Sequence, residues 1–347
     1  MALRILGIET SCDETAAAVV ADGTRVLSNV VHSQIHLHER WRGVVPEVAS
    51  RSHTMRILPI VQQALDDAGV APQELDAIAV THRPGMIGCL LVGMAAAKAL
   101  ALRFSLPLIG VDHVQAHVHT ALLAEPNLRM PSLSLVASGG HTAMYLMRAP
   151  LDTERLGTTR DDAAGEALDK GAALLGLPYP GGPSIENAAQ GGNRRAFDLP
   201  RSLLGPDSLD FSFSGLKTSL LYRLRGPGAT EPERQLGEQE LRDLAASYQE
   251  AVVDALVHKI VRAAERHEAQ SLCIGGGVAR NARLRERLAQ ERRLRGLQLV
   301  LPPMALCSDN GAMIALMGFL QLQRGLTADM ALEPTATPQA GGKAKSR

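Results

Sequence analysis

The first residues that suggest chemistry are His113 and His117, four positions apart in the segment 113–117. On a helix this spacing places both imidazoles on one face, where two ring nitrogens can bind a single metal ion. The alternative is a pair of histidines on a solvated helix face, because a bare HxxxH pattern also arises by chance. The spacing alone leaves both interpretations open.

Asp309 is a candidate third ligand in the segment Cys307-Ser308-Asp309-Asn310-Gly311, which follows a predicted strand and opens a predicted helix. Its alternative role is an ordinary helix N-cap. A His/His/Asp set with open coordination positions suits Fe²⁺ or Zn²⁺ acting as a Lewis acid.

Glycine-rich tips form a second group of candidates. Residues 138–142 read Ser-Gly-Gly-His-Thr, and residues 275–277 are three glycines followed at a short distance by Asn281. Such tips let backbone N–H groups approach an anion or a flat base, although they also occur in ordinary turns. Asp169 is predicted to face inward on a helix, where its carboxylate could accept hydrogen bonds from ligand hydroxyls. Residues 180–183 are predicted to form a rigid turn.

These candidates must be positioned by an alternation of strands and helices, which predicts an α/β fold with a mostly parallel sheet. A hairpin of strands at 4–9 and 15–20 opens the chain, and a second hairpin at 133–137 and 143–147 repeats that device, which indicates an internal duplication. The other predicted strands are 26–31, 77–80, 108–111 and 271–274, and the predicted helices are 48–68, 85–103, 163–175, 216–225, 241–268 and 310–323. Asp112 is predicted to cap the helix that carries the histidines.

The repeated hairpin divides the chain into two lobes. We predict an N-terminal lobe at 1–130, a C-terminal lobe at 131–306, and a closing helix at 307–328 that returns toward the N-terminal lobe. Residues 329–347 are rich in Pro, Thr, Gly and Lys, which predicts a disordered tail.

The composition limits the partners and the compartment. The 347 residues carry 36 basic and 36 acidic side chains, so bulk charge does not indicate a nucleic-acid binder, and such a partner would need a local patch. Arginines at 283–295 offer one, with a solvated helix face as the alternative. The four cysteines form no CxxC pair and no disulfide framework, which favours a reducing compartment. Without a signal-peptide pattern or an apolar run of about 20 residues, we expect a cytoplasmic protein with no membrane partner.

Several blocks resemble one known family. His113-Val114-Gln115-Ala116-His117-Val118, preceded by Lys98-Ala99, Phe104 and Pro107, resembles the defining motif of the former glycoproteases, now understood as tRNA threonylcarbamoyladenosine synthesis proteins (TsaD in bacteria). Matching blocks lie at 6–15, 43–51, 211–218 and 307–315, so the resemblance covers about residues 3–325. The departures are Ser105, Gln115 and Arg83, each at a position where the family usually has another residue.

The resemblance implies the actin/Hsp70/sugar-kinase fold, with two ribonuclease-H-like lobes around a central cleft. It implies transfer of threonylcarbamoyl from threonylcarbamoyl-AMP to N6 of the adenosine 3′ of the anticodon, in tRNAs reading codons that begin with adenine. His113, His117 and Asp309 would bind one divalent metal, Fe²⁺ foremost and Zn²⁺ as the alternative. The residues implied to line the adenylate site are Val136, Ala137, Ser138, Gly139, Gly140, Asp169, Gly182, Glu186 and Asn281.

The resemblance also implies partners besides tRNA: a shorter inactive paralogue (TsaB-like), a small P-loop ATPase (TsaE-like), and ATP as a ligand of the complex. The apolar stretch 90–102 is a candidate docking face. Because the mixed anhydride is already activated, no protein nucleophile is needed, and Asp13 and His141 are candidate proton-transfer residues.

Three rival functions are weighed against this one. A metalloendopeptidase of the HExxH type needs a glutamate base after the first histidine, where this chain has Val114. An ATP-dependent kinase or ATPase shares the fold, but a two-histidine metal site is not expected there. A non-catalytic scaffold would not need an intact His/His/Asp set.

Overall fold

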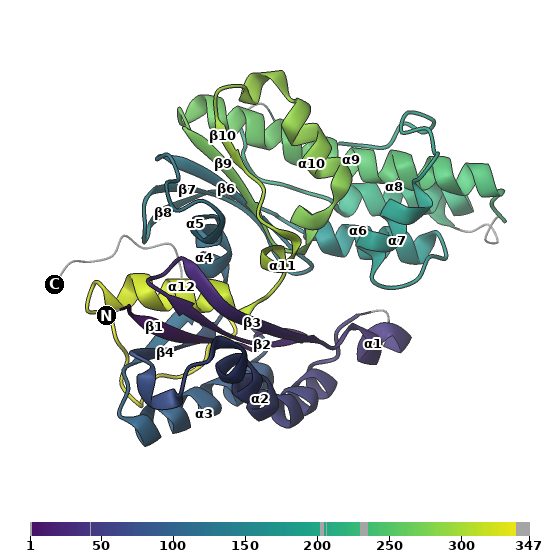
Figure 1. Ribbon diagram of the computed structural model, residues 1–347. Helices are drawn as coiled ribbons and strands as arrows, with labels where there is room; N and C mark the ends of the chain where they lie inside the picture. Colours follow the sequence, from purple (N-terminus) through teal and green to yellow (C-terminus); the bar gives the residue numbers. More distant parts are fainter. Residues whose placement is uncertain (1, 42, 202–204, 206, 230–234, 338–347) are drawn as a thin grey trace. The chain divides into compact units, whose positions relative to one another are not determined.

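Two five-stranded sheets, one in each of two units, organise the chain (Figure 1). The computed structural model describes residues 2–41, 43–201, 205, 207–229 and 235–337. Unit 1 consists of Met1–Leu128, Ala149–Asp152 and Pro302–Arg347, and unit 2 consists of Arg129–Arg148 and Thr153–Leu301. The return of the chain to unit 1 therefore begins at Pro302, slightly before the predicted position 307.

The sheet of unit 1 has the strand order β3-β2-β1-β4-β5. The first three strands form an antiparallel meander, and β4 and β5 continue it in parallel, so the sheet is mixed and the prediction of a mostly parallel sheet is wrong. The strands are β1 (Arg4–Glu9), β2 (Glu14–Ala21), β3 (Arg25–Ser33), β4 (Ala77–Arg83) and β5 (Leu108–Asp112).

Helices cover both faces of this sheet. Leu6 and Ile8 of β1 pack in a core cluster with side chains of α2 (Pro46–Ala68) and α3 (Ile87–Phe104). Ile5 belongs to a second cluster with α12 (Gly311–Leu322), because successive side chains of a strand point to opposite faces. The sheet is buried on both sides, which explains the nearly continuous apolar sequence of β1 and β2. The shorter helices of unit 1 are α1 (Ile35–His38), α4 (His113–His119), α5 (Ala121–Ala124) and α11 (Met304–Cys307).

Helix α3 is long and apolar enough to cross a membrane by length and composition alone. Its side chains Leu90, Met94, Ala97 and Ala101 are buried, and three of them pack in the core cluster of unit 1. About 33% of the helix is buried, and Ile87, Leu91 and Leu102 are exposed, so core packing accounts for only part of its apolar sequence.

The sheet of unit 2 repeats the topology of the first. Its order is β8-β7-β6-β9-β10, with β6 antiparallel to β7 and parallel to β9, as β1 is to β2 and β4. The predicted duplication is thus confirmed. The strands are β6 (Ser132–Ala137), β7 (Thr142–Ala149), β8 (Asp152–Thr158), β9 (Ser271–Gly275) and β10 (Gln298–Val300), and the helices are α6 (Ala164–Leu174), α7 (Gly181–Ala188), α8 (Ser214–Arg225), α9 (Glu238–Arg266) and α10 (Ala282–Gln290).

Two local predictions need correction. Residues 180–183 are not only a turn: Gly181 begins α7, with Pro180 as its N-cap residue. Residues 329–337, predicted to be disordered, instead continue from a contact with β5 at Ala328 to a hydrogen bond with β4 at Thr335. Ala328 N donates to Leu108 O at 2.8 Å, Thr335 N donates to His82 O at 2.8 Å, and Leu332 packs on the core. Composition missed this contact because one leucine and the backbone make it, while residues 338–347 lie outside the described part.

Candidate functional site

The two histidines are positioned by a short capped helix. Strand β5 ends at Asp112, whose Oδ1 accepts hydrogen bonds from Val114 N and Gln115 N, both at 3.1 Å. The predicted cap is therefore confirmed, and α4 begins at His113. His113 and His117 lie one helical turn apart, are buried, and have ring centroids 4.7 Å apart.

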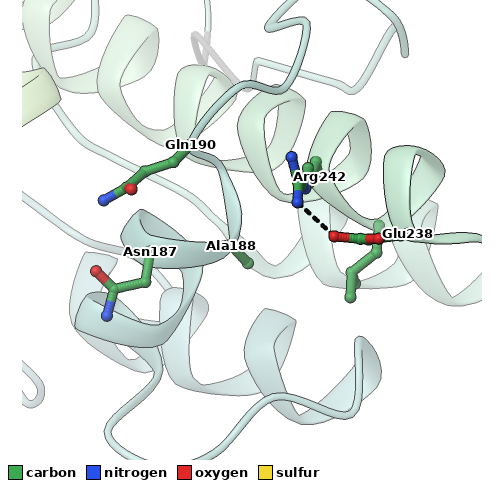
Figure 2. Close-up of a pocket in the computed structure, with 6 residues that line it drawn as sticks. Asn187, Ala188, Gln190, Glu238 and Arg242 are labelled. Carbon is green, nitrogen blue, oxygen red and sulfur yellow. Dashed lines mark hydrogen bonds and ion pairs between the residues drawn. The ribbon is translucent and has the colours of Figure 1, made fainter.

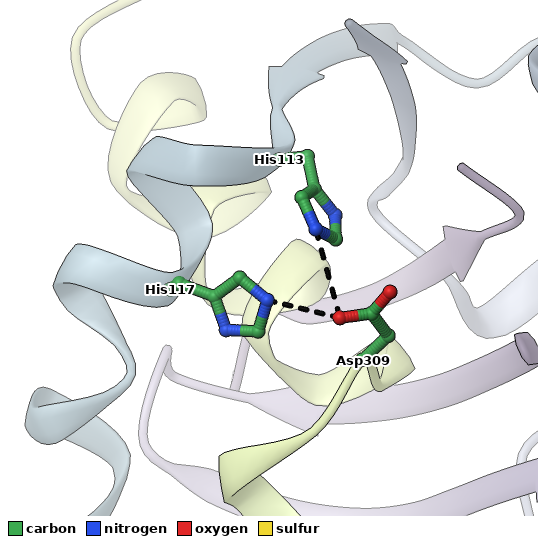
Figure 3. A group of neighbouring side chains, drawn as sticks. All are labelled: His113, His117 and Asp309. Atoms are coloured by element: carbon green, nitrogen blue, oxygen red, sulfur yellow. Dashed lines mark hydrogen bonds and ion pairs between the residues drawn. The ribbon is translucent and has the colours of Figure 1, made fainter. Parts of the chain in front are cut away.

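Asp309 faces both histidines (Figure 3). Its Oδ1 lies 3.0 Å from His117 Nε2 and 3.6 Å from His113 Nε2. The alternative role as helix N-cap is wrong, because Asn310 caps α12 by accepting a hydrogen bond from Met313 N at 3.0 Å. The Asp309 carboxylate is left to face the imidazoles.

This donor set fits a transition-metal ion. The candidate ligand atoms of His113, His117 and Asp309 all lie within 4.8 Å of one another. In a tetrahedral zinc site with bonds near 2.1 Å, ligand atoms are about 3.4 Å apart, a value that the two observed Asp309 distances bracket. Two imidazoles and one carboxylate suit Fe²⁺ or Zn²⁺ and leave coordination positions for water or substrate.

A buried carboxylate contacts the His113 ring on the side opposite to Asp309. Glu9, at the end of β1, is fully buried, and its Oε2 accepts a hydrogen bond from His113 Nδ1 at 2.9 Å. Burial alone would disfavour the charged carboxylate, but the interaction with His113 outweighs it and holds the pKa of Glu9 below its ordinary value. Burial likewise opposes the imidazolium, yet Asp309 and Glu9 raise the pKa of His113 to about 9.

Further carboxylates make the surroundings acidic. Burial, followed by the charges of Asp309 and Asp13, raises the pKa of Glu14 well above its ordinary value. Burial and the charges of Asp13 and Asp309 act in the same direction on the Cys12 thiol, raising its pKa. Crowded negative charge of this kind attracts a cation, and a bound cation would relieve the repulsion. Asp13, the predicted proton-transfer residue, therefore lies in the same acidic neighbourhood as Asp309.

His119 points away from this cluster, as expected from its place on the helix. Its Nδ1 lies 2.8 Å from Gln115 O, and its Nε2 accepts a hydrogen bond from Leu151 N at 3.0 Å. One ring nitrogen donates and the other accepts, which requires the neutral form. Consistently, burial lowers the pKa of His119 to about 4.

The predicted adenylate-site residues lie in unit 2 and begin at the end of β6. Val136 and Ala137 are buried in the sheet, where Val136 pairs with Gly275 of β9. Ser138 then turns the chain, accepting hydrogen bonds from His141 N at its Oγ and from Gly165 N at its carbonyl. Gly139 and Gly140 at the tip are exposed, and a Cβ on either would meet no atom within 4 Å.

The four remaining predicted residues lie on or beside α6, α7 and α10. Asp169 Oδ1 accepts a hydrogen bond from Gly181 N at 2.7 Å, which joins α6 to the first turn of α7, where Gly182 also lies. Glu186 Oε1 accepts from Ala282 N at 3.3 Å, and Asn281 caps α10 through Leu284 N at 3.0 Å. The predicted substrate residues thus surround one set of adjoining loops and helix ends in unit 2.

The two predicted proton-transfer residues belong to different units. Asp13 lies in the β1–β2 hairpin tip of unit 1, where its carbonyl accepts a hydrogen bond from Gln34 N at 3.0 Å. His141 lies in the β6–β7 hairpin tip of unit 2.

The arginines of 283–295 are mostly engaged within unit 2. Arg283 donates two hydrogen bonds to the Glu250 carboxylate, at 2.6 and 2.7 Å. Arg287 donates to Asp254 at 3.3 Å, and Arg285 donates to Ala279 O at 2.7 Å. These guanidinium groups bind α9 and a neighbouring carbonyl, so the solvated-face interpretation is wrong for them. The same contacts weaken the argument for a phosphate-binding patch.

A surface hollow of about 400 Å³ between α7 and α9 contains none of the predicted residues (Figure 2). Its lining includes Asn187, Gln190 and the ion pair between Arg242 and Glu238.

Sequence reasoning missed the role of Glu9. The available signal was a single acidic residue at the end of an otherwise apolar strand, Leu6-Gly7-Ile8-Glu9, because a charge on a buried strand needs a partner.

The chain is similar to known proteins over most of its length. The profile of the family described as tRNA N6-adenosine threonylcarbamoyltransferase (TsaD) matches residues 25–316. A protein of that name from Anaeromyxobacter dehalogenans is 53% identical over 93% of this chain and 95% of its own length. Another, from Moorella thermoacetica, is 49% identical over 95% of both chains.

Solved structures show the same fold at low sequence identity. HypF from T. kodakarensis superposes with a TM-score of 0.62 at 17% identity, over 93% of this chain and 48% of its own. The Clostridium difficile activator of 2-hydroxyisocaproyl-CoA dehydratase, with bound ADPNP, gives 0.52 at 13% identity over 93% of this chain and 97% of its own. These likenesses confirm the predicted actin/Hsp70/sugar-kinase fold.

Proposed function

Because the chain belongs to the tRNA N6-adenosine threonylcarbamoyltransferase family, a family of transferases, we propose that it uses threonylcarbamoyl-AMP as donor. The acceptor in this proposal is N6 of the adenosine 3′ of the anticodon, in tRNAs reading codons that begin with adenine. The observation that carries the metal-dependent part of the proposal is the convergence of His113, His117 and Asp309 on one point.

A divalent ion held by these three residues, Fe²⁺ foremost and Zn²⁺ as the alternative, would supply Lewis-acid polarisation of an oxygen atom of the donor. His113, His117 and Asp309 would fix its position. The burial of His113 and His117 strengthens the electrostatic interactions at their ring nitrogens.

In unit 2, the backbone N–H groups of Gly139 and Gly140 would hold the phosphate of the adenylate. This role is supported by their exposure and by the open space around both residues, since no steric need of the fold requires glycine at either position. The other residues of this site would be Val136, Ala137, Ser138, Asp169, Gly182, Glu186 and Asn281.

Asp13 and His141 are proposed to move the proton that the N6 amine loses when it attacks the carbamoyl carbon. That attack is mainly a matter of proximity, because the anhydride is already activated: the N6–carbon bond forms, the bond from the carbamoyl carbon to the phosphate oxygen breaks, and AMP leaves. An Asp13→Asn variant with normal turnover would remove Asp13 from this role.

The proposed partners are tRNA, the shorter paralogue and the small P-loop ATPase, with ATP as a ligand of the assembly and the cytoplasm as its compartment. Leu91 and Leu102 on α3 are 50% and 74% exposed, which supports an apolar docking face for the paralogue.

One reconstitution tests the proposal. The metal-loaded chain is incubated with its partners, tRNA and synthetic threonylcarbamoyl-AMP, and the digested nucleosides are analysed by mass spectrometry. We expect threonylcarbamoyladenosine in this reaction and a loss of at least 100-fold with Asp309→Asn. No product with partners of proven activity, or ATP-dependent phosphorylation of a small substrate instead, would contradict the proposal.

A further inference from the structure

Glu9 is a buried carboxylate with three hydrogen-bond donors around it. Its Oε2 accepts from Thr81 Oγ1 at 2.6 Å and from His113 Nδ1 at 2.9 Å, while its Oε1 accepts from Ser11 N at 2.5 Å. The side chain is fully buried at the end of β1, and Thr81 lies on the neighbouring strand β4. The position of the carboxylate is therefore fixed by two strands of the sheet.

This contact determines which nitrogen of His113 is available for a metal. A carboxylate at Nδ1 keeps the proton there, so the lone pair of a neutral imidazole lies on Nε2. His113 Nε2 is the atom that faces Asp309, at 3.6 Å. A carboxylate that accepts from a histidine in this way orients the ring and makes it a stronger ligand.

The second histidine has no such support. His117 Nδ1 is buried and has no hydrogen-bond partner among the residues that the structure describes. Its ring contacts the Asp309 carboxylate through Nε2 and the His113 ring edge to face, but its Nδ1 receives no comparable hydrogen bond from the described part of the chain. The hydrogen bond that pre-orients the donor set therefore acts on His113.

We propose that Glu9 is a positioning residue of the metal centre, which fixes His113 as an Nε2 ligand and adds a second buried negative charge beside Asp309. Two carboxylates balance the charge of a divalent ion, which a buried site requires. This inference rests on the proposed metal centre, and it concerns how tightly and through which atom the ion is held.

The test measures metal binding rather than turnover. Full-length protein is stripped with a chelator, and the dissociation constants of Zn²⁺ and Co²⁺ are measured by competition with a chromophoric chelator, together with the visible spectrum of the Co²⁺ form. For Glu9→Gln we expect affinity to fall by about 10- to 100-fold and the Co²⁺ spectrum to change.

Two further variants separate position from charge and from general damage. Glu9→Asp keeps the charge but shortens the side chain, so we expect a smaller loss than with Glu9→Gln. The matched control is Thr15→Val, which removes another buried hydrogen bond to a histidine in unit 1, from Thr15 Oγ1 to His53 Nδ1 at 2.8 Å. It should leave metal affinity within about threefold.

The outcomes are distinguishable. A parent protein that binds neither metal would overturn the metal centre itself, and this inference with it. A parent that binds while Glu9→Gln binds equally well, or a Thr15→Val variant that loses as much affinity, would overturn the role of Glu9 alone. If Glu9→Gln does not fold, Thr81→Val removes one donor to the same oxygen, and unchanged affinity in that variant counts against the inference.

Discussion

Adjacent residues at the start of α12 should separate metal binding from folding. Asp309 faces the two histidines, whereas Asn310 is fully buried and caps the helix. Asn310 Oδ1 accepts from Met313 N at 3.0 Å, and its Nδ2 donates to Ser308 O at 2.8 Å. Replacing each residue in turn tests whether the two roles are distinct.

Asp309→Asn should abolish tight metal binding with little effect on the empty protein. Partners behind a ligand are worth about 10- to 100-fold in affinity, so loss of a charged ligand should cost at least roughly 100-fold. In the empty protein the lost attraction to His113 is opposed by relief of the repulsion that Asp309 exerts on Glu14. We therefore expect the free energy of unfolding of unit 1 to change by no more than about 1 kcal/mol.

Asn310→Ala should give the opposite pattern. Loss of a buried cap costs about 1–2 kcal/mol, while the three candidate ligands remain. Urea unfolding of the stripped proteins measures stability, and competition with a chelator measures affinity. If Asp309→Asn unfolds the protein while Asn310→Ala loses the metal, or if both variants lose both properties equally, the division of roles is wrong.

Three other changes have definite expected outcomes. Gly7→Ala would place its Cβ 2.3 Å from Gly311 O and 2.4 Å from Ala315 N, so it should destabilise unit 1 by about 3 kcal/mol, and an unchanged unfolding midpoint would refute the close approach of β1 and α12. Burial disfavours the charged Glu250 carboxylate, but Arg283 outweighs burial and lowers the pKa of Glu250 below 4.5, so the unfolded state takes up a proton first as pH falls. The stability that this ion pair gives unit 2 should therefore be present above pH 4.5 and decline below it. Glu250→Gln should flatten that decline in urea midpoints measured from about pH 6 to 3.5. Gly140→Ala should leave the melting temperature unchanged, because its Cβ meets nothing within 4 Å, yet lower tRNA modification if the backbone there binds phosphate, and equal activity would argue against that contact.

The elements that were predictable are those with strong local patterns. The hairpin of β1 and β2 and the strand–helix alternation follow from apolar runs separated by polar tips, and the cap at Asp112 follows from residue type and position. The metal cluster needed more, because Asp309 is almost 200 residues from His117. The resemblance to the family assigned Asp309 and the two histidines to one site, and the structure places their ligand atoms close together.

What the sequence did not reveal depends on tertiary contacts. Strand β8 has only a weak alternation of exposed and buried residues, so its sequence does not stand out as a strand. Helix α7 begins in a segment whose glycines and prolines indicate a turn. The role of Glu9 depends on Thr81 and His113, each of which is distant in sequence. The pairing of arginines with α9 likewise depends on where Glu250 and Asp254 lie, which charge counting does not show.

The position of α12 has a consequence for synthesis on the ribosome. The helix packs on Ile5, Ala18 and Ala79, but it begins at Gly311, whereas β1 ends at Glu9, so its residues are translated long after that strand. Domains generally fold as units from the N-terminus during synthesis, yet unit 1 must keep this apolar face uncovered until α12 has been translated. Unit 2, whose last residue is Leu301, can finish first. Asp309 emerges with α12, so a nascent chain acquires its third candidate metal ligand only as its exposed face closes.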